Sequence, residues 1–154
     1  MIELDQIDKK ILQALQQNSK ANIKEIALKV GLTQTPTYER IKRLEKSGVI
    51  QHYVAVLNKV KIGYTVEVFC QVTLLVHSKK LITRFENAIN KMDEVIACFH
   101  VAGNYDYLLK VIVKDMNSYQ NFLKNKLSVL DSVSNVQSTF VMTSTKPQTG
   151  LPLN

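Results

Sequence analysis

Cationic and hydrogen-bonding side chains gather in one segment near the N-terminus, between residues 29 and 46. This segment carries five lysines or arginines against two acidic residues. A helical wheel centred on Ile41 turns Thr37 and Leu44 inward and leaves the basic side chains outside. Such a helix can lie in the major groove of duplex DNA, where lysine and arginine neutralise phosphates and polar side chains read base edges. The sequence therefore predicts a helix that binds double-stranded DNA.

The expected DNA contacts divide by position along this helix. Side chains at its N-terminal end are placed to reach base edges, whereas cations further along set a salt-dependent affinity. We expect contacts to bases or sugars from Gln34, Thr35 and Tyr38. We expect contacts to phosphate or guanine from Arg40, Lys42 and Arg43. The competing interpretation is a generic three-helix domain whose basic face is simply solvated.

A second polar cluster stands far along the chain, at Gly103-Asn104-Tyr105-Asp106. An amino acid presents an ammonium, a carboxylate and a side chain, and its binding site needs an acceptor, several donors and an apolar wall. These four residues offer loop amides, an amide side chain, an aromatic ring and a carboxylate. Plain hairpin geometry explains Gly103 and Asn104 equally well, and Asp106 has the alternative of bonding its own turn. For Asp106 we favour ligand binding.

No catalytic or metal-binding pattern accompanies these clusters. His52, His77 and His100 are scattered without ligand spacing, and the sequence has no phosphate-binding loop or nucleophile elbow. Cys70 and Cys98 have no close partner in sequence, which favours small core residues in a reducing compartment. We therefore expect a protein that is not an enzyme and that needs no cofactor or metal.

The composition is typical of a folded protein that is not exported. The chain has 154 residues, of which 45% are hydrophobic and 21% charged, so it can bury a core. Acidic residues stand at the start, where a secretory signal would be basic, and no apolar run approaches bilayer-spanning length. The formal charge of +7 favours an anionic partner. We expect a cytoplasmic, nucleoid-associated protein without membrane contact.

Three predicted helices position the basic face. An apolar stripe indicates an amphipathic helix over residues 5–17. Asn22 is a suitable N-cap for a short helix that ends at Gly31, and Thr33 is a suitable N-cap for the third helix. Residues 49–57 are rich in β-forming residues and predict a short wing or linker strand. Helix, short helix, turn and helix follow the helix-turn-helix plan.

Alternation of apolar and polar residues begins after residue 60. Even positions from 66 to 76 are apolar, which predicts a strand with one buried face. We expect further elements in the order helix 78–92, strand 95–101, strand 105–113, helix 119–130 and strand 133–142, with a tight turn of positive φ at Gly103-Asn104. The order β-α-β-β-α-β is the ferredoxin-like plan, an α+β fold. We place a winged helix-turn-helix domain at residues 1–60 and an effector-binding and oligomerisation domain at 61–154.

Motifs in both halves carry a family resemblance. The first half contains Asp5-x-x-Asp8-x-x-Ile11-Leu12, Ile26-Ala27-x-x-Val30-Gly31-Leu32-Thr33 and Arg40-Ile41-x-Arg43-Leu44-Glu45-x-x-Gly48-Val49-Ile50. The second half contains Val101-x-Gly103-x-x-Asp106-Tyr107-Leu108-Leu109-x-Val111. Together these motifs resemble the leucine-responsive and asparagine-responsive regulators, the Lrp/AsnC family of transcription factors. The resemblance covers nearly the whole chain.

The resemblance implies a sequence-specific transcriptional regulator with an amino acid effector. It implies homodimers that assemble further, commonly into octamers, with the effector bound between dimers. In the family the turn at residues 103–106 contributes to the effector site, together with residues of the last strand. The corresponding residues of this strand are Ser138, Thr139 and Val141. Residues 143–147 depart from the family, whose members commonly carry more charge and no proline there, and this affects the outer pocket.

Two other classes of protein compete with this interpretation. One is a small-molecule-binding or metabolic α+β domain whose N-terminal helices make only protein contacts. The other is a sequence-tolerant DNA-compacting protein, which would bind unrelated duplexes nearly as well as specific ones. The basic face of the third predicted helix argues against the first alternative.

Overall fold

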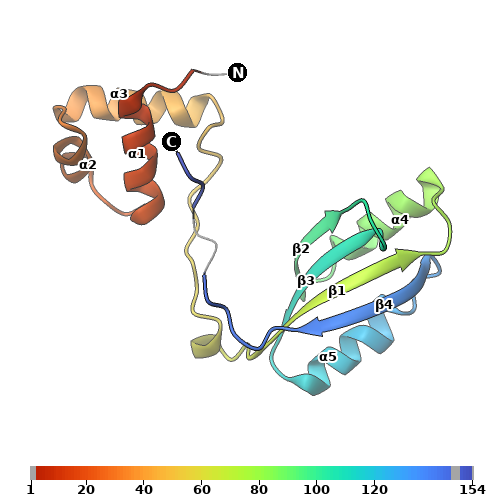
Figure 1. Ribbon diagram of the computed structural model, residues 1–154. Coiled ribbons are helices and arrows are strands. Elements are labelled where there is room, and N and C mark those ends of the chain that lie inside the picture. Colours follow the sequence, from red (N-terminus) through yellow and green to blue (C-terminus); the bar gives the residue numbers. More distant parts are fainter. Residues whose placement is uncertain (1–2, 147–149, 154) are drawn as a thin grey trace. The chain divides into compact units, whose positions relative to one another are not determined.

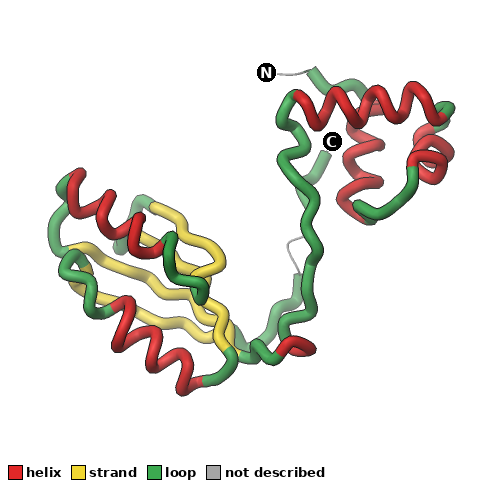
Figure 2. Tube along the Cα trace, turned by 180° about the vertical axis from the view of Figure 1, so that it is seen from behind, coloured by secondary structure: helices red, strands yellow, loops and turns green. Residues whose placement is uncertain are grey.

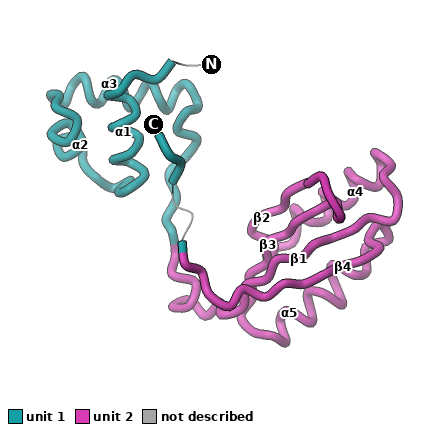
Figure 3. Tube along the Cα trace, viewed as in Figure 1, with its two compact units in different colours: residues 1–56, 146–154 teal, residues 57–145 magenta. Residues whose placement is uncertain are grey.

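The computed structural model (Figure 1) describes residues 3–146 and 150–153. The chain divides into two compact units, of which the first comprises Met1–Val56 and Lys146–Asn154 and the second Leu57–Thr145 (Figure 3). We expected a boundary at residue 60 and the whole C-terminal segment in the second domain, whereas the last residues join the first unit. Pro147, part of the departure from the family pattern, lies outside the described residues.

Three helices form the body of the first unit, as predicted: α1 (Gln6–Gln17), α2 (Ile23–Val30) and α3 (Gln34–Lys46). Asn22 caps α2, because its side chain accepts a hydrogen bond from the Glu25 amide at 2.9 Å. Gly31 ends α2 in the left-handed conformation, with φ of 73°. The expected cap at Thr33 is wrong in one respect. Thr33 occupies the N-cap position of α3, but its side chain makes no cap hydrogen bond in the described structure.

Apolar residues from all three helices form one core in this unit. Its most deeply buried members are Ile11, Ile26 and Leu44, with exposed fractions of at most 1%. Burying side chains of this size stabilises the fold by roughly 1.5 to 3 kcal/mol each. Leu153 from the C-terminal tail is half-buried against the same core. The core therefore holds α3 in place and also explains why the tail belongs to the first unit.

Hydrogen bonds to α1 reinforce the position of the tail. Gln13 Nε2 donates to the carbonyl oxygen of Leu153 at 3.1 Å. Gln16 bonds the backbone of Leu151 twice, donating to its carbonyl oxygen at 3.3 Å and accepting from its amide at 2.5 Å. A glutamine that pairs with both backbone groups of one residue mimics a strand partner.

The predicted wing or linker strand is not formed. Residues 51–58, all of which the structure describes, contain neither helix nor strand, and Val54 and Val56 are 65% and 78% exposed. Residues with a preference for strands need a neighbouring strand to satisfy their backbone groups. The segment is therefore a linker, and a short 3₁₀ turn at Val60–Ile62 follows it.

The second unit is a four-stranded antiparallel sheet with the strand order β2-β3-β1-β4. Its elements are β1 (Val66–Leu74), α4 (Lys79–Ile89), β2 (Val95–His100), β3 (Tyr107–Val113), α5 (Met116–Phe122), a π-helical continuation (Leu123–Leu127) and β4 (Val133–Phe140). Both helices lie on one face of the sheet, in front of the strands in Figure 2. The β-α-β-β-α-β order and the α+β fold are confirmed.

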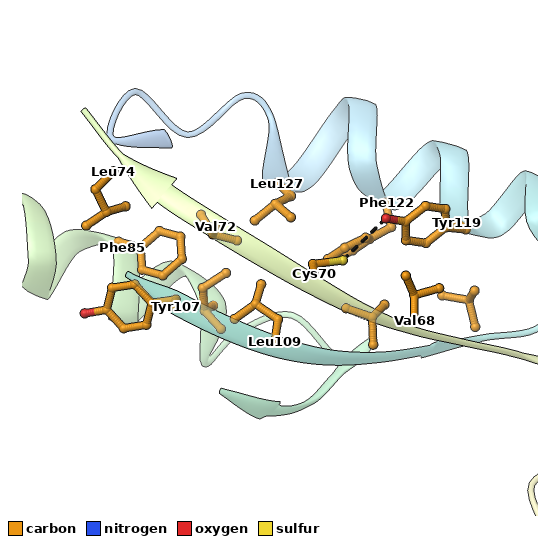
Figure 4. Packing of buried hydrophobic residues seen from close by; sticks show 13 residues of the cluster. Val68, Cys70, Val72, Leu74, Phe85, Tyr107, Leu109, Tyr119, Phe122 and Leu127 are labelled. Carbon is orange, nitrogen blue, oxygen red and sulfur yellow. Dashed lines mark hydrogen bonds between the residues drawn. The ribbon is translucent and has the colours of Figure 1, made fainter. Parts of the chain in front are cut away.

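The core of this unit lies between the sheet and the two helices (Figure 4). Val68, Cys70 and Val72 on β1 are fully buried, which confirms the alternation seen in the sequence. Phe85 of α4 and Phe122 of α5 cover them with exposed fractions of at most 1%. Both cysteines of the chain are free thiols, Cys70 buried and Cys98 half-buried.

The loop between β2 and β3 differs from the expected two-residue turn. Residues 101–106 connect the strands, and the Val101 amide donates to the Asp106 carbonyl oxygen at 2.9 Å across the base of the loop. Gly103 has φ of 155°, and no residue other than glycine among those described has a positive φ. Asn104 therefore does not adopt the left-handed conformation of a tight hairpin. The longer loop exposes more backbone amides than a two-residue turn.

Candidate functional site

The N-terminal half of α3 collects the three residues expected to contact bases. Thr37, Ile41 and Leu44 are buried, as the helical wheel predicts. The predicted base-contacting side chains are exposed and line a shallow, open depression together with Ile23 at the start of α2. The lining residues from α3 are Gln34, Thr35 and Tyr38. Amide, hydroxyl and phenol groups next to an aliphatic side chain provide both hydrogen bonds and apolar contact for base edges.

The predicted phosphate-binding cations are already partnered within the chain. Arg40 Nη1 donates to Asp5 Oδ2 at 2.6 Å and to Asp8 Oδ1 at 2.8 Å, and its side chain is only 26% exposed. Arg43 donates to Asp8 Oδ2 at 2.5 Å and is 54% exposed. Arg40 therefore faces α1, whereas Arg43 lies at the edge of the outward face.

The partner of Lys42 lies on the same helix, whereas the partners of Arg40 and Arg43 lie on or next to α1. Its ammonium is 3.1 Å from Glu45 Oε2 and 5.6 Å from the centre of the Tyr38 ring. Glu45 raises the pKa of Lys42 through this hydrogen bond, and Lys42 followed by Tyr53 lowers the pKa of Glu45. Burial and the same carboxylate raise the pKa of Tyr53 to about 12. The ammonium of Lys42 lies on the exposed side of α3, within reach of a ligand.

Asp5 and Asp8 form an acidic pair that the sequence pattern did not connect with arginine. Asp5 is the N-cap of α1, and the two residues exchange backbone-to-side-chain hydrogen bonds in a capping box. The Asp8 amide, followed by Arg40, lowers the pKa of Asp5, and Asp5 and then Asp8 raise the pKa of Arg40. The motif Asp5-x-x-Asp8 contained the signal for the cap, but pairing with α3 depends on how the helices pack.

Asp106 ties the β2–β3 loop to the end of β1. Its Oδ2 accepts from the Leu74 amide at 2.7 Å, and its Oδ1 lies 2.7 Å from His77 Nε2. The Asp106 amide donates to the Val72 carbonyl oxygen at 2.9 Å. The Leu74 amide, followed by His77, lowers the pKa of Asp106. The carboxylate is therefore negatively charged at neutral pH, and its hydrogen bonds run to residues outside the β2–β3 loop.

Two histidines converge at this end of the sheet, although their sequence spacing suggests no relation. His77 bonds Asp106, and the His100 ring stacks on Tyr107 with centroids 4.7 Å apart. Tyr107 is 1% exposed, and its hydroxyl donates to Glu86 at 2.8 Å. Burial, followed by Glu86, raises the pKa of Tyr107. Alternation along one strand did not reveal this cluster, because its members come from separate elements.

The predicted effector residues of the last strand divide between the two faces of the sheet. Ser138 pairs with Cys70 across β4 and β1, on the face of the sheet that the helices cover. There the Ser138 hydroxyl forms a hydrogen bond with the Tyr119 hydroxyl, and the Tyr119 oxygen is 3.4 Å from the Cys70 sulfur. Thr139 pairs with Phe69 and points to the other face. The Val141 amide bonds the Glu67 carbonyl oxygen at 2.9 Å.

The effector loop is also distant from Val141 along β1. Asp106 lies beside Val72 and Leu74, while Val141 lies beside Glu67, five residues earlier, which corresponds to roughly 17 Å along a strand. A single chain thus keeps the loop residues Gly103, Asn104, Tyr105 and Asp106 together and separates them from part of the last strand.

Two kinds of feature are absent from the part of the chain that the structure describes. Among the described residues, no group of three or more histidine, cysteine, aspartate or glutamate side chains could hold a metal ion. Across the same residues, the helices are too short or too polar to cross a membrane. A helix-turn-helix unit with an exposed polar face, joined to a ferredoxin-like unit, defines a two-domain transcriptional regulator.

Comparisons with known proteins identify the family within this class. Residues 4–51 match the family model for winged helix-turn-helix DNA-binding domains, and residues 67–151 match that for the Lrp/AsnC ligand binding domain. The chain belongs to the Lrp/AsnC family of transcriptional regulators. The resemblance inferred from the motifs is confirmed.

Characterised relatives match along the whole chain. It is 39% identical over 153 residues to the Bkd operon transcriptional regulator of Pseudomonas aeruginosa, which covers 99% of this chain and 100% of the relative. It is 37% identical over 144 residues to the leucine-responsive regulatory protein of Escherichia coli, covering 94% and 88% of the two chains. A Neisseria meningitidis transcriptional regulator solved as a complex with L-Met superposes with a TM-score of 0.96 and 34% identity, over 99% of this chain and 98% of that chain.

Proposed function

We propose that this regulator binds specific duplex DNA through α3, with an amino acid as the effector of its second unit. The observation that carries the DNA proposal is the grouping of Gln34, Thr35 and Tyr38 on the exposed side of α3. Lys42 and Arg43 lie close by and supply positive charge for phosphates. Because DNA is the target, we place the protein in the cytoplasm, on the nucleoid, acting as a regulator rather than an enzyme.

A gel-shift titration with the DNA upstream of the protein's own gene tests this proposal. We expect the affinity to fall steeply as salt rises from low to moderate concentration, because phosphate contacts release counterions. Arg43→Ala should lower the slope of log K against log salt by about 0.9, one phosphate contact. Binding that is absent or insensitive to salt would contradict the proposal. Equal affinity for unrelated duplexes would instead favour a DNA-compacting protein.

The open face of the sheet supports a homodimer. Both helices cover the opposite face (Figure 2), so within the described part of the second unit no helix covers Phe99 and Leu108, which pair across β2 and β3. Phe99 is 52% exposed. A two-fold dimer would present two copies of α3 to successive major grooves roughly 34 Å apart, and a palindromic site follows. We infer dimers that assemble further into octamers, which light scattering of the purified protein will test.

We propose that the amino acid binds beside the loop formed by residues 101–106, in a site completed by another chain. The support is the complex of a close structural relative with L-Met, together with the separation of the loop from Thr139 and Val141 in a single chain. Thermal-shift measurements with a panel of amino acids should identify a stabilising ligand. Asp106→Ala should abolish that shift. If millimolar amino acids have no effect, the protein is an effector-independent regulator.

A further inference from the structure

Asp8 is the most deeply buried charged residue in the first unit, with an exposed fraction of 1%. It lies in the first turn of α1, and it forms ion pairs with two residues of α3. Oδ1 accepts from Arg40 at 2.8 Å and Oδ2 from Arg43 at 2.5 Å. A carboxylate is bidentate, so each oxygen has its own guanidinium. One buried carboxylate therefore joins α1 to two points on the helix that faces DNA.

The spacing of the two arginines determines what this connection can do. Arg40 and Arg43 are three residues apart and lie next to each other on α3. Two contacts from neighbouring positions to one fixed point oppose rotation of the helix about its own axis. The apolar contacts of Ile41 and Leu44 hold α3 against the core, but they are non-directional. The charged hydrogen bonds add the directional constraint that these contacts lack.

Rotation of α3 affects two kinds of DNA contact differently. Thr35 has a short side chain and Tyr38 a stiff one, and the Gln34 amide reads a base edge only in a defined orientation, so all three must meet base edges at hydrogen-bonding distance. Lysine and arginine reach phosphates with long flexible stems and tolerate a small rotation. Loss of the connection at Asp8 should therefore weaken discrimination between sequences more than it weakens attraction to DNA in general.

We propose that Asp8 is a positioning residue for sequence recognition, with Arg40 serving Asp8 rather than a phosphate. The proposal rests on the proposed function of α3 as the DNA-binding helix. Arg40 is also bound by Asp5 at 2.6 Å and is largely covered. Arg43 is 54% exposed, and its guanidinium has five N–H donors, so it can hold Asp8 and still donate to a phosphate.

Asp8→Asn tests this proposal against a variant with the same change in charge. Glu45→Gln also removes one negative charge near α3, but the ionic partner of Glu45 is Lys42 on α3 itself. Affinities for the upstream duplex and for an unrelated duplex of equal length are measured for wild type and both variants. We expect Asp8→Asn to lower the ratio of the two affinities about tenfold, the value of one lost base contact. Glu45→Gln should change both affinities equally and leave the ratio at the wild-type value.

Arg40→Gln provides an independent measurement if Asp8→Asn does not fold at the assay temperature, which circular dichroism will show. The ratio of the affinities of Arg40→Gln for the upstream and the unrelated duplex should also fall. The slope of log K against log salt for this variant should stay at the wild-type value. Arg43→Ala should lose about 0.9 of that slope, which shows that the assay detects one phosphate contact.

Different outcomes separate this inference from the proposed function. Wild-type protein without salt-dependent binding to either duplex contradicts the proposed function itself. If the wild-type protein binds DNA and Asp8→Asn has the same ratio of upstream to unrelated affinity as Glu45→Gln, the role of Asp8 is overturned. A slope reduced by about 0.9 in Arg40→Gln would make Arg40 a phosphate contact and would overturn its role as a partner of Asp8.

Discussion

The two units of this protein assemble their candidate sites in different ways. In the first unit the expected DNA contacts all come from the single helix α3, although one of them, Arg40, turns toward α1. In the second unit the expected effector contacts come from the β2–β3 loop and from β4, where neighbours such as Ser138 and Thr139 point to opposite faces. A helix groups residues three and four apart, whereas a strand separates adjacent ones. The DNA-binding surface is thus contained within one chain, and the effector site we propose needs two.

Charged pairs hold separate segments together in both units. Asp8 joins α1 to α3 in the first unit, and in the second Glu67 on β1 bonds Lys59, just before the turn at Val60–Ile62, and Lys110 on β3. Burial tends to raise the pKa of Glu67, but Lys59 and Lys110 outweigh burial and hold it below its usual value. The two carboxylates differ in the segment that they hold. Asp8 holds the helix α3, and Glu67 holds the beginning of the second unit.

The largest expected effect tests whether the two units are independent. Phe122 is fully buried in the second core, so Phe122→Ala should reduce the free energy of unfolding of that unit by about 4 kcal/mol. Calorimetry of the full chain should show a lowered transition for the second unit and an unchanged transition for the first. Leu28→Ala, at a position 84% exposed, is the control and should change either transition by less than about 0.5 kcal/mol. A common shift of both transitions would contradict independent units.

The next effect concerns the loop that we assign to the effector. Asp106→Asn should destabilise the second unit by about 1 kcal/mol at neutral pH, because the charged bonds to the Leu74 amide and His77 weaken. The pKa of Asp106 is lowered from 3.8 in the folded protein. This contribution is therefore present above pH 3.8 and is lost as pH falls through the lower, folded pKa.

Urea unfolding of wild type and Asp106→Asn over a series of pH values will measure this contribution. The difference between the two proteins should persist from neutral pH down to about pH 5 and should shrink in strongly acidic solution. A difference that persists undiminished in strongly acidic solution would contradict the pairing of the Asp106 carboxylate. Asp115→Asn, which alters another low-pKa carboxylate of the same unit at the N-cap of α5, shows whether the response is specific to the loop.

A comparable effect tests the place of the C-terminal tail. Leu153 is half-buried against the core of the first unit, so Leu153→Ala should lower the stability of that unit by about 1 kcal/mol and leave the second unchanged. Leu151→Ala removes a side chain that is 75% exposed and serves as the matched control. A loss of stability in the second unit would assign the tail to that unit instead.

The smallest effect is expected at Thr33, in a comparison of two helix starts of the first unit. Asn22→Ala should cost about 1 kcal/mol, because its side chain caps α2. Thr33→Ala should cost only a few tenths of a kcal/mol, since its side chain makes no cap bond in the described structure. Equal losses for both variants, measured by urea unfolding, would indicate that Thr33 caps α3 in solution.

Local patterns predicted most of the fold. The three helices of the first unit, the α+β order of the second and the buried even positions of β1 follow from periodicity, which a residue shares with its close neighbours in sequence. Three local predictions failed. Residues 49–57 have strand-forming composition but gain no strand partner, and the turn at Gly103-Asn104 belongs to a longer loop held by Asp106. Thr33 takes the N-cap position of α3 without the expected cap hydrogen bond in the described structure.

The sequence by itself determined which helix and which loop bear the residues that we predict for the two sites. It could not determine the pairing of Asp8 with Arg40, 32 residues later, or of His77 with Asp106, 29 residues later. The contact of Gln16 with Leu151 spans 135 residues. Only the tertiary structure decided these pairs, because a side-chain contact between distant residues depends on how whole elements pack, and packing depends on the combined shape and burial of many residues.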